Sequence, residues 1–127
     1  MMSFRLLVAV TVLFADLAIG MRRPAAGFHN RLVKAAPAVN DTVSPAPTKL
    51  ELWFAEAPDV ALSRVRLKPA EDTTRTLSTG EIVKGSDAKS IAVSVDTTLG
   101  PGAYLVAWRT ASADGHIIKG QYQFRVR

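Results

Sequence analysis

Short runs of alternating apolar and polar residues, separated by turn-forming residues, dominate the sequence from residue 32 onward. Alternation is clean in Leu50–Phe54, Ile91–Val95 and Tyr122–Val126, whereas Tyr104–Trp108 is nearly all apolar, as in a strand buried on both faces. Pro, Gly, Ser and Asp separate the runs, and no stretch keeps the period of an amphipathic helix. The pattern predicts an all-β domain, either a sandwich or a small barrel.

Five or six strands follow from the alternation, and Leu32–Ala36 is the candidate for a seventh. Inward positions of these runs predict a core that includes Leu52, Phe54, Val93, Val106, Trp108 and Phe124. Trp53 is also expected in the core, because large aromatic side chains bury most of their surface there. Glu51, Glu56 and Asp96 are expected to point outward into solvent.

Residues 1–27 read as a secretory signal peptide that precedes a single domain, 28–127. Arg5 is followed by an apolar run, Leu6–Ala15, which is shorter than the roughly 20 residues that span a bilayer. Small residues at −3 and −1 predict cleavage after Gly20 or after Gly27. An uncleaved N-terminal anchor is the alternative, and no stable membrane insertion is expected after processing.

Charge and cysteine content exclude several classes of protein. The 16 Lys and Arg exceed the 11 Asp and Glu, for a net charge of +5. The excess is scattered along the chain, and only Arg22 and Arg23 are adjacent, so nucleic-acid binding is not expected. The chain has no cysteine, which excludes disulfides, thiolate metal sites and cysteine nucleophiles.

Histidine is the scarcest polar residue, with only His29 and His116 in the chain. Asp114 lies two positions before His116, and on an extended segment both side chains would project from one face. An imidazole with a carboxylate suits Cu(II), Ni(II), Zn(II) or Fe(II). The alternative is that Asp114-Gly115 is merely a hairpin turn that binds no metal.

Four segments, in order and with compatible spacing, carry a resemblance to a known family. They are His29–Ala38, Leu50–Pro58, Gly102–His116 and Lys119–Val126. Together they resemble the CopC family of periplasmic copper-resistance proteins, and the block from Tyr104 to Asp-Gly-His116 is the most specific part. The resemblance covers roughly residues 28–127. It implies an immunoglobulin-like Greek-key β-sandwich of about seven strands.

The resemblance also implies a Cu(II) site made of the N-terminal histidine with its amine, and of the Asp and His of the Asp-Gly-His motif. On this chain the ligands would be His29, Asp114 and His116. Cleavage before Phe28 would leave His29 second in the mature protein, whereas cleavage before Met21 would place it well inside. The family's pattern has this histidine first, so the role of the amine depends on processing.

The function expected from this resemblance is a periplasmic carrier or buffer of Cu(II) in copper resistance and homeostasis, with no catalysis. A membrane copper transporter is the expected receiver. The three methionines are Met1, Met2 and Met21, so a thioether site for Cu(I) is not expected. The alternatives are an immunoglobulin-like binding module without metal and a copper mono-oxygenase-like enzyme.

Overall fold

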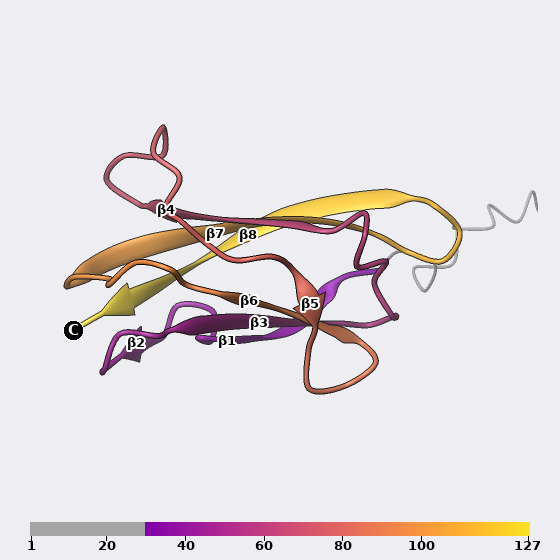
Figure 1. Ribbon diagram of the computed structural model, residues 1–127, viewed down its shortest axis with the longest axis horizontal. Coiled ribbons are helices and arrows are strands. Elements are labelled where there is room, and N and C mark those ends of the chain that lie inside the picture. Colours follow the sequence, from indigo (N-terminus) through magenta and orange to yellow (C-terminus); the bar gives the residue numbers. More distant parts are fainter. Residues whose placement is uncertain (1–29) are drawn as a thin grey trace, which may run out of the picture.

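The computed structural model describes residues 30–127, which form two four-stranded sheets packed face to face (Figure 1). The strands are β1 (Leu32–Ala36), β2 (Thr42–Val43), β3 (Lys49–Phe54), β4 (Arg64–Pro69), β5 (Val83–Lys84), β6 (Ser90–Ser94), β7 (Gly102–Ala111) and β8 (Ile117–Val126). The β3 sheet has the order β1-β3-β6-β5, and the β7 sheet has the order β2-β8-β7-β4. The expected signal peptide, 1–27, and His29 lie outside the described residues.

The predicted β-sandwich is confirmed, and the candidate strand Leu32–Ala36 is β1. Residues 30–127 form eight strands where about seven were expected. The additional elements come from β2 and β5, each only two residues long, too short to show any alternation in the sequence. Within the same residues no helix is long and apolar enough to cross a bilayer.

Most neighbouring strands are not consecutive in the sequence, because the chain changes sheet at most of its connections. The β2–β8 pair is parallel, and the remaining pairs are antiparallel. Such crossing connections are those of a Greek-key sandwich. The longest uninterrupted pairing joins β7 to β8, from Gly102↔Val126 to Ala111↔Ile117.

The core lies between the two sheets and contains all six residues predicted for it, namely Leu52, Phe54, Val93, Val106, Trp108 and Phe124. Phe54 of the β3 sheet and Trp108 of the β7 sheet meet edge to face, with ring centroids 5.2 Å apart. The prediction for Trp53 is wrong. Since Leu52 and Phe54 point inward, Trp53 points outward, half-buried, with the Lys34 Nζ 4.4 Å from its ring centroid.

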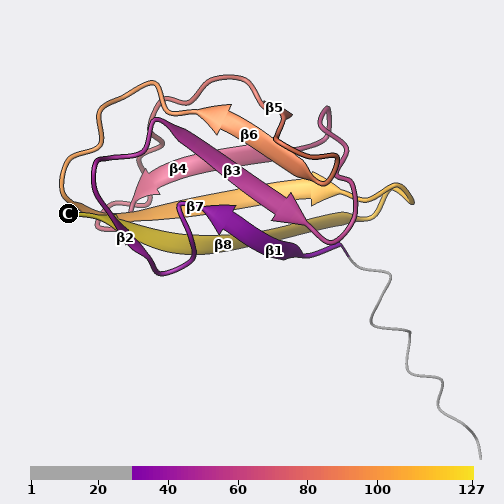
Figure 2. The same ribbon diagram turned by 90° about the horizontal axis from the view of Figure 1, so that it is seen from below.

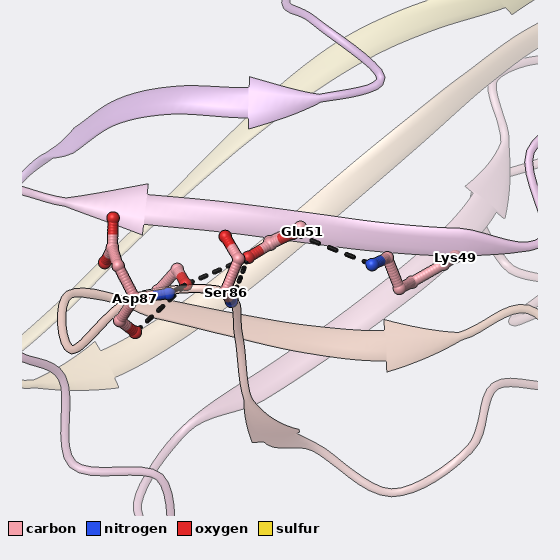
Figure 3. A network of polar contacts seen from close by, with 5 residues as sticks. Lys49, Glu51, Ser86 and Asp87 are labelled. Atoms are coloured by element: carbon pink, nitrogen blue, oxygen red, sulfur yellow. Dashed lines mark hydrogen bonds and ion pairs between the residues drawn. The ribbon is translucent and has the colours of Figure 1, made fainter.

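Glu51 also points away from the core, but the prediction that it is solvated is wrong, because only 5% of its surface is exposed. The connection between β5 and β6 covers it (Figure 3). Its Oε1 accepts hydrogen bonds from the Ser86 N–H at 2.5 Å and the Ser90 hydroxyl at 3.0 Å, and its Oε2 lies 3.8 Å from the Lys49 Nζ. Burial raises the pKa of Glu51, but the donors of Ser86 and Ser90, with the Lys49 charge, bring it below the ordinary value.

Gly85 allows this close approach, because a Cβ at that position would collide with the Ser90 hydroxyl and the Glu51 carboxylate. The other two carboxylates expected in solvent differ from Glu51. Asp96 is exposed as predicted, and Glu56 is half-buried. Burial of a carboxylate on this face therefore depends on the overlying connection and not on the strand itself.

Candidate metal centre

The Asp114–His116 pair lies in the connection between β7 and β8, at one end of the sandwich. The Ser112 N–H donates to the His116 carbonyl at 3.1 Å, and the Gly115 N–H donates to the Ser112 carbonyl at 2.9 Å. Gly115 has a φ of 83°, in the region that favours glycine. The segment is therefore the hairpin turn that was the alternative interpretation, and not an extended stretch.

The turn nevertheless brings the two side chains together. The Asp114 Oδ2 lies 2.6 Å from the His116 Nδ1. The Asp114 Oδ1 accepts hydrogen bonds from the Ser112 hydroxyl and, at 3.1 Å, from the His116 N–H. The predicted proximity is confirmed, although its reason is the turn and not strand alternation.

The hydrogen bonds around Asp114 keep its carboxylate ionised. The Ser112 hydroxyl, followed by the His116 imidazole and backbone N–H, holds the pKa of the Asp114 carboxyl well below its usual range. Both side chains remain accessible, with 47% of Asp114 and 70% of His116 exposed. The hairpin thus presents a fixed anion beside an imidazole at the protein surface.

Asn30 is a residue of this region that the sequence analysis missed. It is only 3% exposed, and its Oδ1 accepts a hydrogen bond from the Glu56 N–H at 2.9 Å. The Arg31 carbonyl accepts a second bond, from the Ala55 N–H at 2.9 Å. The Nδ2 of Asn30 has no hydrogen-bond partner within residues 30–127. The chain that follows His29 is therefore fastened to the connection after β3; the only sequence signal is an Asn next to the start of an apolar strand.

The connection between β3 and β4, residues 55–63, joins Asn30 to the hairpin. At its other end the Asp59 N–H donates to the Ala111 carbonyl at 3.0 Å, and the buried Ser63 and Thr110 hydroxyls lie 2.7 Å apart. In Figure 2 the start of β1 and the β7–β8 hairpin accordingly lie at the same end of the sandwich, and the C-terminus lies at the other. Two regions distant in the sequence thus meet through one loop.

The described residues do not form a complete metal site. Within 30–127 no group of three or more His, Cys, Asp and Glu side chains is placed to hold a metal ion. Asp114 and His116 are the two predicted ligands that the structure brings together, and His29 lies outside the described residues. A hollow of about 490 Å³ lies at the opposite end of the hairpin, beside Leu99, Gly102 and Arg125, and has no histidine in its lining.

Comparison with known proteins gives a family match over nearly all of the described chain. The CopC domain model matches residues 32–127. Copper resistance protein C of Xanthomonas campestris pv. juglandis is 30% identical over 131 residues, covering 100% of both chains. Protein YobA of Escherichia coli K12 is 32% identical over 114 residues, covering 89% of this chain and 90% of its own.

Two solved structures share the fold. PcoC, a methionine-rich copper resistance protein from Escherichia coli, has a TM-score of 0.70 and 30% identity, covering 78% of this chain and 99% of its own. CopC from Methylosinus trichosporium OB3b has a TM-score of 0.68 and 28% identity, with coverages of 77% and 93%. The whole sandwich is therefore shared with these chains, and not only the hairpin motif.

Proposed function

Because this chain belongs to the CopC family, we propose that it binds copper as cargo and serves in copper resistance and homeostasis. The observation that carries the proposal is the Asp114–His116 pair, fixed by the hairpin turn at an exposed end of the sandwich. An exposed pair suits a carrier or buffer, since the ion must be taken up and released. We propose no catalytic role.

We propose that the ligands are His29, Asp114 and His116, and that the ion is Cu(II). Cu(II) favours nitrogen and oxygen ligands in a tetragonal plane, which imidazoles and a carboxylate can supply. Asn30, the residue that follows His29 in the sequence, is hydrogen-bonded to Glu56 at the end of the sandwich that carries the hairpin, and this supports His29 as the third ligand. His29 is also the only other imidazole in the chain.

Asp114 contributes in two ways to this site. Its ionised carboxylate attracts a cation and can supply an oxygen ligand. Its contact with the His116 Nδ1 also holds the imidazole beside the carboxylate, and an ion bound by both side chains would replace this contact, since one ring nitrogen cannot bond a hydrogen and the ion at once. Ser112 in turn holds the carboxylate in place.

The methionine content supports Cu(II) over Cu(I). Soft thioethers select Cu(I), and residues 22–127 contain no methionine. PcoC, in contrast, is described as methionine-rich. We therefore propose that this chain lacks a thioether site and handles the oxidised ion.

Export and cleavage complete the proposal. We propose that residues 1–27 direct the chain to the periplasm and that cleavage follows Gly20 or Gly27, leaving the domain 28–127 to carry copper to a membrane copper transporter. Cleavage after Gly27 leaves the terminal amine one residue from His29, where both could bind the same ion. Mass spectrometry of the exported protein decides between the two sites, and retention of Met1 would contradict the signal peptide.

The central test is a competitive Cu(II) titration of the exported protein and its His116→Ala variant, with electron paramagnetic resonance to count coordinated nitrogens. We expect the variant to lose copper affinity by more than about 100-fold, since loss of a residue that merely supports a ligand already costs 10- to 100-fold. Gln121→Ala, an exposed change on β8, is the matched control. Equal affinities of His116→Ala and the wild type would overturn the copper site and leave a plain hairpin turn. Ascorbate-driven oxygen consumption by the copper-loaded protein would contradict the absence of catalysis.

A further inference from the structure

The outward face of the β7 sheet carries basic side chains on three adjacent strands. β4 presents Arg64, Arg66 and Lys68, in alternation with the buried Val65, Leu67 and Pro69. β7 adds one cation and β8 adds two; they are Arg109, Lys119 and Arg125. All of the six are exposed except Lys68, which is half-buried. We refer to these six residues as the basic face.

The strand register places like charges directly opposite one another. Arg64 pairs with Arg109, and Arg109 pairs with Lys119, so one row across three strands is entirely cationic. Directly opposite residues have Cβ atoms about 5 Å apart, and like charges at that spacing destabilise a sheet. The row therefore lowers the stability of the sheet, which indicates that these cations serve a function other than stabilising the fold.

Carboxylates do not neutralise the basic face. No acidic residue occupies an outward position on β4, β7 or β8. Among residues 30–127 the ion pairs within 4.0 Å are Lys49–Glu51 and Asp114–His116, and neither involves the basic face. The fold therefore brings cations that are scattered along the sequence onto one face, where their electrostatic potential is positive throughout.

Three of the arginines surround a hollow in this face. Its volume is about 260 Å³, and its lining comprises Arg64, Arg66 and Arg109 together with Ala107 and Trp108. A guanidinium binds phosphate oxygens through two parallel hydrogen bonds. Arginines that line one hollow thus suit a phosphate group, although the Arg64 Nη1 also donates to the Ala61 and Ser63 carbonyls at 3.0 and 2.7 Å.

We propose that the basic face docks the exported protein on a bilayer containing anionic phospholipids. The face is broad, and its other outward side chains include Ala103, Ala107, Gln121 and Gln123, with Leu105 half-buried and Ile117 exposed next to the hairpin turn. It presents no outward aromatic residue on β4, β7 or β8, whereas the core of a protein–protein interface is typically rich in them. Distributed cations bind peripherally to an anionic lipid surface, by electrostatic attraction to many headgroups.

Docking through this face would also orient the hairpin. The Arg109–Lys119 pair lies just before the end of the β7–β8 ladder, where the turn that holds Asp114 and His116 begins. Bound to the bilayer by its β7 sheet, the domain would hold this turn beside the membrane surface. This consequence rests on the proposed copper site, whereas the docking itself does not.

Sedimentation with lipid vesicles tests the proposal on the protein as it is exported. The vesicles contain either phosphatidylcholine alone or equal parts of phosphatidylcholine and phosphatidylglycerol. One variant combines Arg64→Gln, Arg66→Gln and Arg109→Gln. The matched control combines Lys34→Gln, Lys84→Gln and Lys89→Gln, which removes the same charge from exposed positions outside the β7 sheet.

We expect the wild type to bind the vesicles that contain phosphatidylglycerol and not those of phosphatidylcholine alone. It should dissociate from the vesicles at about 1 M salt. The basic-face variant should bind about 100-fold more weakly, and the control variant should stay within a few-fold of the wild type. Thermal melting checks that the variants fold, and Lys119→Gln with Arg125→Gln is an independent variant on β8. Equal losses in variant and control, or no preference for phosphatidylglycerol, would overturn the proposal. Tighter binding to duplex DNA than to the vesicles, lost in the same variant, would overturn it in favour of a nucleic-acid partner.

Discussion

Glu51 and Asp114 are carboxylates with similar hydrogen-bond partners and different surroundings. Each accepts hydrogen bonds from a serine hydroxyl and a backbone N–H, and each has a lowered pKa. Glu51 lies under the β5–β6 connection and contacts a lysine, whereas Asp114 lies on an exposed turn and contacts an imidazole. The donors around a carboxylate therefore do not distinguish a structural role from the ligand role proposed for Asp114. Exposure and the neighbouring imidazole do.

The largest effect that this comparison predicts is on folding. Glu51→Ala removes the acceptor of the Ser86 N–H and leaves the buried Ser90 hydroxyl with only the Asp87 carbonyl at 3.3 Å, so the free energy of unfolding should fall by about 2 to 3 kcal/mol. Copper affinity should stay at the wild-type value. Urea unfolding with copper titration of the folded variant measures both, and Lys49→Ala is the milder control because that side chain is mostly exposed. A loss of copper affinity would mean that the two carboxylates are coupled.

The converse change is Asp114→Ala, which should weaken Cu(II) binding by about 10- to 100-fold and leave the melting temperature nearly unchanged. The reason is that the carboxylate is exposed and its bonds stay within the hairpin. Asp114→Asn retains an oxygen without the charge and should lie between the two. A large drop in melting temperature with intact copper affinity would give Asp114 the structural role assigned to Glu51.

The two carboxylates also predict separate pH windows. The pKa of Glu51 is lowered below its ordinary value of 4.5, so its stabilisation is present above that pH and is lost as the pH falls through the folded-state value. Cu(II) should leave earlier, because imidazole is more basic than a carboxylate and protons compete with the ion for it as the pH falls. An acid titration followed by electron paramagnetic resonance and circular dichroism should show copper release from a folded protein. Simultaneous release and unfolding would contradict this order.

The smallest predicted effect concerns Asn30, which we expect to contribute both to the stability of the fold and to copper binding. Asn30→Ala removes the acceptor of the Glu56 N–H, so it should cost about 1 kcal/mol of stability. With His29 as a proposed ligand, the change should also weaken copper binding several-fold, because Asn30 follows His29 in the sequence and would lose its bond to Glu56. In a His29→Ala background the same change should leave copper affinity unaltered. An equal effect in both backgrounds would show that Asn30 acts on the fold alone.

Some of these features could be read from the sequence and others could not, as two tryptophans show. Trp108 was predicted in the core, and it lies at an inward position of β7, where buried and more exposed residues alternate. Trp53 was assigned to the core by residue type, although Leu50, Leu52 and Phe54 already fix the inward phase of β3. In that case the period of the strand was the better guide, because side-chain direction follows the pleat.

Local alternation in the sequence determined the all-β class, the main strands and most of the core, and spacing determined the closeness of Asp114 and His116, because each of these depends on residues close together in the chain. The sandwich and the family followed from a resemblance carried by four segments in order. The tertiary structure alone decided the burial of Glu51, through a connection 35 residues away, and the attachment of Asn30 to Glu56, 26 residues away. It likewise decided the basic face, since strand register places Arg64, Arg109 and Lys119 in one row. The physical reason is that alternation and turn propensity act locally, whereas which strand lies beside another, and which loop covers it, depends on packing of the whole chain.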